Sequence, residues 1–401
     1  MESTLMTQTT IGRCLGSAAP WALSLLICLG GISRMSRCIA DEATHDSTPL
    51  CIASYNVSLY GKKAGEVATK LRTGKDRQAR SIASIIQTVR PDIVLLNEID
   101  HDADASTVKL LRDLYLAVAQ DGCESIDYPY VYSAPSNTGV NSALDLNRNG
   151  RSGDPEDAWG FGVYEGQYAF AVLSRYPIET EDVRTFQTFR WSNLPDALRP
   201  IDPKTKQSYY SDEVWNSLRL SSKNHVDVPI RVGDQTVHLL ASHPTPPVFD
   251  GLEDRNGCRN HDEIAFWKHY LDDSAFLVDD GGTKGGLRKD AVFVIAGDLN
   301  SDPQGSDNRP EAIRSLLSHE RVIDPLPRRL SANESTPMTE AFDTADFGRN
   351  GEMRVDYVIP SRDFQISEAN VFWPSDDMKG SKWIHASDHR MVWVKGVLKS
   401  R

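Results

Sequence analysis

The chain has 401 residues, of which 40% are hydrophobic and 25% charged, a balance typical of a globular protein. No internal repeat recurs at a fixed period, which excludes solenoids and propellers. The formal net charge of −12 argues against a protein that coats nucleic acid, although bound divalent cations can invert the field locally in a nuclease.

Residues 1–40 predict a secretory signal peptide. A basic residue precedes the apolar run from Ala18 to Ile32, and Cys38-Ile39-Ala40 places small residues before a cleavage point after residue 40. The run is shorter than the roughly 20 apolar residues that span a bilayer, so we expect no membrane span in the mature chain. Flanking arginines leave an uncleaved anchor as the alternative. Cleavage would give a secreted or periplasmic chain of net charge −14, since it removes three arginines and one glutamate.

Residues 41–49 are polar and predict a linker, and residues 50–401 predict one domain because no break in composition divides them. The apolar run 50–55 predicts a strand that delivers Asn56 at its end. A helical repeat of apolar residues begins near residue 77 and ends before Pro91. The buried strand predicted at 93–96 is followed by Glu98.

The rest of the chain alternates in the same way. Further strands are expected at 168–174, 237–241, 291–296, 355–359 and 391–394, and helices at 262–277 and 311–317. Strands mixed with helices around one core predict an α/β fold. Loop-rich inserts near 120–165 and 187–224 are long enough to serve a site.

Almost every predicted strand ends in a side chain that can do polar chemistry. These residues are Asn56, Glu98, His243, Asp298, Asn300, Asp356, Asp388 and His389. Strand ends converge on one rim of a sheet, and carboxylate and amide oxygens suit a hard cation such as Mg²⁺ or Mn²⁺. Each residue alone has a structural alternative: His243 as a packed loop histidine, for example, or Asp298 as a turn residue.

Six fragments resemble the endonuclease/exonuclease/phosphatase superfamily, whose fold is that of deoxyribonuclease I. They stand in the family's order: Ser54-Tyr55-Asn56, Asp92-Ile93-Val94-Leu95-Leu96-Asn97-Glu98, Ser242-His243, Gly297-Asp298-Leu299-Asn300-Ser301-Asp302, Arg354-Val355-Asp356-Tyr357-Val358 and Ser387-Asp388-His389. The resemblance covers residues 50–397. It implies a four-layer sandwich of two mixed β-sheets flanked by helices, and hydrolysis of a phosphoester by water with a bound Mg²⁺.

The resemblance also implies roles. Glu98 resembles the principal metal ligand, with Asn56 and Asp388 near it. Asp298 would activate the water and Asn300 would hold a phosphate oxygen. His243 resembles a general acid or phosphate contact, which Asp356 would support. His389, paired with Asp388, would bind the phosphoryl group.

A second pattern is independent of the first. Asp145, Asn147, Asn149, Gly150 and Glu156 follow the spacing of an EF-hand calcium loop. Convincing helices do not flank it, so we expect either an isolated structural Ca²⁺ site that stiffens the insert or a solvated polar loop.

Other features are less specific. Arg255 and Arg259 are candidates for substrate phosphate contacts, or for ion pairs with neighbouring carboxylates. Tyr164 and Tyr168 precede a strand where some relatives carry a catalytic tyrosine. Cys123 and Cys258 fall in polar stretches, and a disulfide between them is a hypothesis for an exported chain.

The sequence leaves the substrate open among nucleic acid, nucleotides and small phosphoesters, and implies no stable protein partner. A metallophosphatase with a two-metal centre is disfavoured because no Gly-Asn-His element occurs. The non-enzymatic alternative is a calcium-stabilised binding module on an inactive phosphoesterase scaffold. Such scaffolds should lack Glu98, Asp298 or His389, and all three are present.

Overall fold

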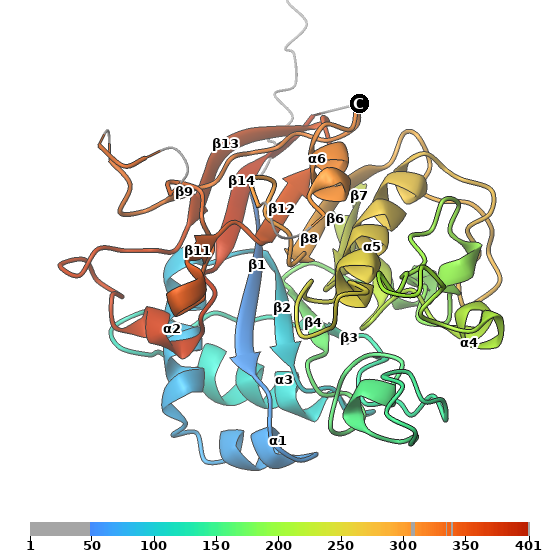
Figure 1. Ribbon diagram of the computed structural model, residues 1–401. Helices are drawn as coiled ribbons and strands as arrows, with labels where there is room; N and C mark the ends of the chain where they lie inside the picture. Colours follow the sequence, from blue (N-terminus) through green and yellow to red (C-terminus); the bar gives the residue numbers. More distant parts are fainter. Residues whose placement is uncertain (1–48, 306–308, 334, 338–339, 400–401) are drawn as a thin grey trace, which may run out of the picture. The chain divides into compact units, whose positions relative to one another are not determined.

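The computed structural model describes residues 49–401 except 306–308, 334, 338–339 and 400–401. The predicted signal peptide, residues 1–40, and nearly all of the predicted linker lie outside the described residues. The described chain is an α/β protein built from two β-sheets with helices on their outer faces, which confirms the predicted fold class (Figure 1).

The first sheet has seven strands in the order β3-β4-β2-β1-β14-β13-β9. They are β1 (Leu50–Leu59), β2 (Ile93–Ile99), β3 (Tyr130–Ser133), β4 (Phe170–Ser174), β9 (Arg328–Arg329), β13 (Phe364–Val371) and β14 (Val392–Leu398). The sheet is mixed, because β1 pairs in parallel with β2 and antiparallel with β14.

The second sheet has five strands in the order β12-β8-β7-β6-β5. They are β5 (Arg184–Thr185), β6 (His225–Val232), β7 (Gln235–Ser242), β8 (Val292–Asp298) and β12 (Asp356–Pro360). Strands β7 and β8 are parallel and the other pairs are antiparallel. A separate ribbon pairs β10 (Ala345–Asp346) with β11 (Glu352–Met353).

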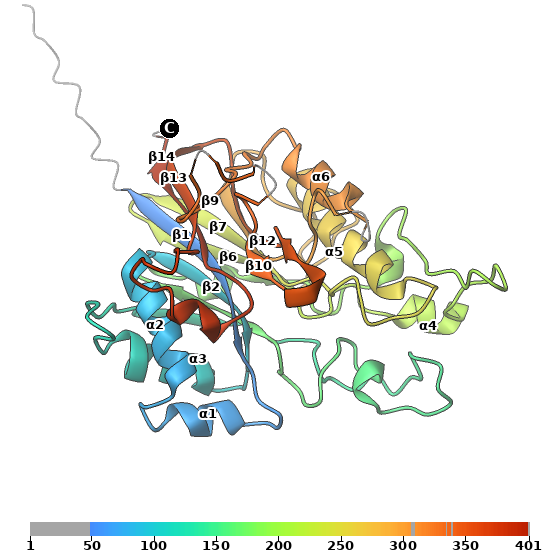
Figure 2. The same ribbon diagram turned by 60° about the vertical axis from the view of Figure 1, so that its left-hand side comes forward.

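Helices form the two outer layers. The outer face of the first sheet packs on α1 (Glu66–Leu71), α2 (Arg77–Val89) and α3 (Ser106–Leu111), and that of the second on α5 (Arg255–Leu271) and α6 (Glu311–Leu317). Figure 2 shows the blue and cyan helices on one side of the strands and the yellow and orange helices on the other. Helix α2 is well delimited, because Asp76 caps its first turn and Arg90 ends it in a left-handed conformation just before Pro91.

The strands place the polar residues by alternation. Inward-facing side chains of β1, β8 and β12 form one apolar core between the sheets, with Ile52, Ala296 and Val358 among them. Successive side chains of a strand point to opposite faces, so residues two or four positions along share a face. The inward-facing rows therefore continue with Asn56, Asp298 and Asp356. These three polar side chains lie together at one end of the apolar core between the sheets.

Several elements differ in extent from the predictions. Strands β1 and β2 run past Asn56 and Glu98, which lie within strands and not after them. Helix α5 begins at Arg255 and ends at Leu271, earlier than the predicted 262–277. Strand β6 was not predicted, although Val226, Val228, Ile230 and Val232 alternate in the pattern of a half-buried strand, with Pro229 on the opposite face.

The insert at 187–224 is not structureless. It contains α4 (Asp212–Ser217), and its large apolar side chains join the core against α5: Trp191, Leu194, Tyr210, Trp215, Leu218 and Leu220. The insert at 120–165 contributes Leu146 to the same core. Both inserts are therefore packed parts of the domain.

The hypothesis of a disulfide between Cys123 and Cys258 is wrong, because both cysteines are free and buried. Cys123 Sγ lies 3.3 Å from Thr88 Oγ1 of α2. Cys258 belongs to α5 in the opposite helical layer and not to a polar loop.

The buried His225 predicts a loss of stability in acid. Its ring contacts Ser221 Oγ and the Glu263 carbonyl, at 2.6 and 2.7 Å, and burial lowers its pKa to about 4. The unfolded chain, with a histidine pKa near 6.5, then binds one more proton between pH 6.5 and 4, so stability falls as the pH falls through that window. We expect this residue to reduce the free energy of unfolding by about 2 kcal/mol between pH 7 and pH 5. Urea unfolding of the wild type and of His225→Gln measures it, and an equal pH slope in both would contradict it.

Candidate active site

The polar end of the inter-sheet core opens into a cleft of about 1750 Å³. Glu98, Asp298, Asn300, Asp388 and His389 all line it. These side chains come from both sheets, so the site exists only when the sandwich is assembled.

Asp298 lies at the centre of the group. Its Oδ2 accepts a hydrogen bond from Asn56 Nδ2 at 3.0 Å, and its Oδ1 accepts one from the Asn300 backbone N–H at 2.9 Å. Burial raises the pKa of this carboxyl group, which the positive charge of His389 partly offsets. Asp298 is thus a buried, oriented carboxylate that can accept a proton.

His389 is paired with Asp356, not with its sequence neighbour Asp388 as predicted. His389 Nδ1 lies 2.9 Å from Asp356 Oδ2, and its Nε2 lies 3.7 Å from Asp298 Oδ2. Burial lowers the pKa of His389, but Asp356 and then Asp298 outweigh it and raise the pKa to about 10. The ring is therefore cationic at neutral pH.

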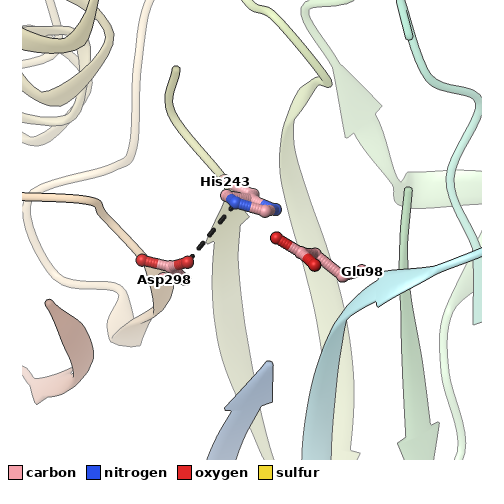
Figure 3. A group of neighbouring side chains, drawn as sticks. All are labelled: Glu98, His243 and Asp298. Atoms are coloured by element: carbon pink, nitrogen blue, oxygen red, sulfur yellow. Dashed lines mark ion pairs between the residues drawn. The ribbon is translucent and has the colours of Figure 1, made fainter. Parts of the chain in front are cut away.

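His243 has the opposite character. The ring follows β7, is 2% exposed, and has no hydrogen-bond partner on either nitrogen. Its Nε2 lies 3.4 Å from Asp298 Oδ2 (Figure 3). Burial lowers its pKa well below the usual value, and the positive charges of Lys223 and His389 lower it further. Asp356 does not support this ring, contrary to prediction, since Asp356 pairs with His389.

Glu98 reaches the site through an irregularity of β2. Leu96 and Ile99 both face the outer helices, and between them Glu98 adopts a positive φ of 55°. The pairing of β1 with β2 shifts register between Asn56 and Leu59 at the same place. Such conformations are costly for a residue other than glycine and concentrate at functional sites. Figure 3 shows the Glu98 carboxylate directed toward His243 and Asp298.

The residues present suit a divalent cation. Glu98, His243 and Asp298 offer ligand atoms that all lie within 4.8 Å of one another. Both ring nitrogens of His243 are buried without a partner, which leaves one free for a ligand. A second group, Asp298, Asp356 and His389, is equally compact, but its histidine and Asp356 satisfy each other. Two carboxylates with the amide of Asn56 beside them supply oxygen ligands of the kind that hard divalent cations take.

Two further predicted residues lie at the edge of this group. Asn300 Nδ2 donates to the Pro244 carbonyl at 3.1 Å. Asp388 is exposed, and its Oδ1 accepts a hydrogen bond from Ser58 Oγ at 3.1 Å. Their roles toward substrate and metal stay predictions.

Residues 53–389 match the model of the Endonuclease/Exonuclease/phosphatase family. The chain belongs to this family. No curated protein sequence matches it.

Solved structures from bacteria, Caenorhabditis elegans and humans align with most of the chain. An endonuclease/exonuclease/phosphatase from Beutenbergia cavernae is 17% identical with a TM-score of 0.49, covering 88% of this chain and 72% of that one. Sphingomyelinase C from Streptomyces griseocarneus is 16% identical with a TM-score of 0.47, covering 88% and 100%. The human Nocturnin catalytic domain with bound sulfate is 14% identical with a TM-score of 0.46, covering 88% and 94%. The family assignment rests on the match over residues 53–389.

In this family member, sequence reasoning missed Lys223. The side chain lines the cleft, is 6% exposed, and has one long hydrogen bond, from Nζ to the Pro244 carbonyl at 3.5 Å. Asn300 donates to the same carbonyl, so Lys223 Nζ and Asn300 Nδ2 lie beside each other. Only the strand pairing reveals that Lys223 lies at the site. Strand β6 is antiparallel to β7, with His225 opposite Ser242, so Lys223 before β6 lies near His243 after β7.

Glu263 was also missed, and it holds the two loops that carry Lys223 and His243. Its carboxylate accepts from the backbone N–H groups of Ser222 and Thr245, each at 2.6 Å. Glu263 is 1% exposed on α5. It therefore acts on the site by positioning loops and does not line the cleft.

Arg255 and Arg259 both line the cleft, but their guanidinium groups have partners. Arg255 pairs with Glu253. Arg259 donates to the carbonyls of Leu220, Trp159 and Arg219, which ties α5 to both inserts. Contact with substrate phosphate stays a prediction for both, and Lys223 is the less occupied cation.

Side-chain oxygens of the predicted calcium loop accept hydrogen bonds from N–H groups of the same loop. Asp145 accepts from the N–H groups of Asn149 and Gly150 at 3.0 and 2.9 Å, and Asn147 Oδ1 accepts from Asn149 at 3.0 Å. Asn149 Nδ2 donates to Asp154 at 2.6 Å.

Calcium binding at this loop stays a prediction. If the oxygens of Asp145, Asn147, Asn149 and Glu156 bind Ca²⁺, adding it should raise the melting temperature of the wild type, because an ion that binds only the folded state stabilises it. The Asp145→Asn variant should show a smaller rise. An unchanged melting temperature in the wild type would contradict the prediction.

Proposed function

We propose that the protein hydrolyses a phosphoester with a water nucleophile and a divalent cation, Mg²⁺ or Mn²⁺, held by Glu98 with Asn56 and Asp298 beside it. The family's phosphoester chemistry gives the reaction class. The observation that carries the proposal is the placement of the buried carboxylate of Asp298 between a cationic and a neutral histidine, each within 4 Å.

Each protein group has a defined task in this proposal. Asp298 accepts the proton of the attacking water, and its two hydrogen bonds fix the orientation of its oxygens. The cationic His389 stabilises negative charge on the phosphoryl oxygens, with Asp356 fixing its ring. When bound, the divalent cation supplies further positive charge against the same oxygens.

His243 serves as a hydrogen-bond donor to a phosphoryl or leaving-group oxygen. Its lowered pKa keeps the ring neutral at pH 7, so it retains one N–H to donate. This favours the phosphate-contact role over general acid catalysis at neutral pH.

Lys223 supplies a second positive charge to the phosphate. A buried ammonium with one long hydrogen bond can still donate two others. We expect Lys223→Met to raise the inhibition constant of inorganic phosphate about 10- to 100-fold, the usual weight of a hydrogen bond to a charged group. Lys206→Met, a change of an exposed lysine, is the control. An unchanged inhibition constant in the Lys223 variant would show that Lys223 does not contact the phosphate.

The metal is tested with Mn²⁺ binding followed by electron paramagnetic resonance. The wild type should bind Mn²⁺ and lose hydrolysis when the ion is chelated, and Glu98→Gln should bind it at least ten times more weakly, as loss of one charged ligand predicts. Wild-type hydrolysis that persists in excess chelator would overturn the metal part of the proposal.

We also propose that the protein acts outside the cytoplasm. Support comes from the basic, apolar and small-residue segments within residues 1–40. Within the described residues, no helix is long and apolar enough to cross a membrane. N-terminal sequencing of the exported protein should begin at Asp41, and a mature chain that retains the apolar run would contradict cleavage.

A further inference from the structure

Three neighbouring aromatic side chains line the cleft. The ring centroids of Tyr60 and Tyr168 are 4.4 Å apart, and those of Phe161 and Tyr168 are 6.3 Å apart. Tyr60 and Phe161 are 41% and 52% exposed, so their rings are not buried by the protein itself. We call these three residues the aromatic shelf.

Backbone pairing places the shelf beside Glu98. Leu59, which precedes Tyr60, pairs with Ile99, which follows Glu98. The Ile99 N–H donates to the carbonyl of Ala169, the residue after Tyr168, at 3.1 Å. Two shelf residues therefore flank Glu98 through hydrogen-bonded neighbours, one on each side of β2.

The two loops that carry the shelf are held together by buried polar contacts. Tyr164 Oη donates to Asp100 at 2.6 Å, and Asp100 accepts from the Gly61 N–H at 3.1 Å. Gln167 Nε2 donates to the Gly61 carbonyl at 2.8 Å. The Tyr164 hydroxyl is thus engaged in contacts within the protein. These contacts hold the shelf in place before a ligand binds, which lowers the entropic cost of ligand binding.

Resting on the proposed phosphoesterase activity, we propose that the shelf binds a flat unsaturated ring in the alcohol part of the substrate, either a nucleobase or another aryl group. An exposed aromatic side chain can stack on any planar unsaturated ring, because each such ring presents a π-face. The shelf and the phosphate-handling groups share one cleft, so one molecule can occupy both. Saturated sugar or alkyl phosphates would leave the shelf exposed to water.

The test compares four phosphates by calorimetry, in Mg²⁺ and in an Asp298→Asn background that blocks turnover. Adenosine 5′-monophosphate and phenyl phosphate carry a ring, and ribose 5-phosphate and butyl phosphate do not. Both ring ligands should bind about tenfold more tightly than their ring-free counterparts, the usual worth of one stacked ring. Phe161→Ala and Tyr60→Ala should remove that advantage and leave ribose 5-phosphate unchanged. Val163→Ala, which changes an exposed side chain of the same loop outside the cleft lining, should change nothing.

The outcomes separate the shelf from the proposed function. Tighter binding of adenosine 5′-monophosphate alone would assign a nucleobase, and equal gains for both ring ligands would assign a general aryl site. Equal binding of ring and ring-free ligands, with wild-type hydrolysis intact, would overturn the shelf and leave the phosphoesterase standing. Failure of all four to bind, with no hydrolysis by the wild type, would overturn both.

Discussion

Replacing Asp298 with asparagine should lower the rate of phosphoester hydrolysis about 10⁴-fold, the upper range for loss of a general base. The amide keeps the shape of the side chain and can still accept at Oδ1 from the Asn300 N–H. It cannot accept a proton from water, so kcat should fall far more than KM changes. Single-turnover rates measure the loss.

Two controls make this result specific. Glu340→Gln neutralises an exposed carboxylate of the same cleft and should retain activity within about twofold, as surface charge changes usually do. Circular dichroism should show Asp298→Asn folded like the wild type at the assay temperature, although its melting temperature should fall because Asn56 Nδ2 loses its acceptor, Oδ2. Activity of Asp298→Asn close to that of the wild type would exclude Asp298 as the base.

Breaking the pair of Asp356 and His389 should have the next largest effect. Asp356→Asn removes the main cause of the raised His389 pKa, so the buried ring loses its charge at neutral pH. We expect a fall in kcat of about 10³-fold, less than the roughly 10⁴-fold loss when the orienting aspartate of a Ser-His-Asp triad is replaced, because Asp298 still holds part of the charge on His389. His389→Ala should cost at least as much, and the double variant no more than His389→Ala alone, because the two residues act as a unit.

The pH profile tells this role apart from a structural one. In the wild type, His389 stays protonated below a pKa of about 10, so its contribution should persist from pH 7 to 9 and decline only as the pH rises through 10. In Asp356→Asn, the residual activity should instead decline as the pH rises between about 6 and 8, near the ordinary histidine pKa. Identical profiles, or additive losses in the double variant, would contradict the pairing.

Much of the site could be predicted because side chains alternate between the two faces of a strand and because polar residues stand near the ends of the strands. Asn56, Asp298 and Asp356 each continue an inward-facing apolar row, so a correct strand assignment places them near one another. The same rule explains the wrong partner for His389. Neighbours in an extended chain point to opposite sides, so Asp388 faces the exposed rim while His389 faces Asp356 of the other sheet.

Other features depend on contacts between distant segments and were not predictable. Lys223 precedes a strand, and only the antiparallel pairing of β6 with β7 brings it to the site. The aromatic shelf joins the end of β1 to the loop before β4 through Tyr164 and Gln167. The insert at 187–224 looked like loop because its aromatic residues lack helical or strand periodicity, yet they pack on α5.

In the proposed function, this cleft hydrolyses phosphoesters with a cation near Glu98 and with Asp298 as base. The most direct test is the initial rate of bis(4-nitrophenyl) phosphate hydrolysis by the wild type and Asp298→Asn, each in Mg²⁺, in Mn²⁺ and in excess chelator. We expect turnover by the wild type with either metal, loss of that turnover in chelator, and background rates for Asp298→Asn throughout. Equal rates for the two proteins, or wild-type turnover unchanged by chelator, would contradict it.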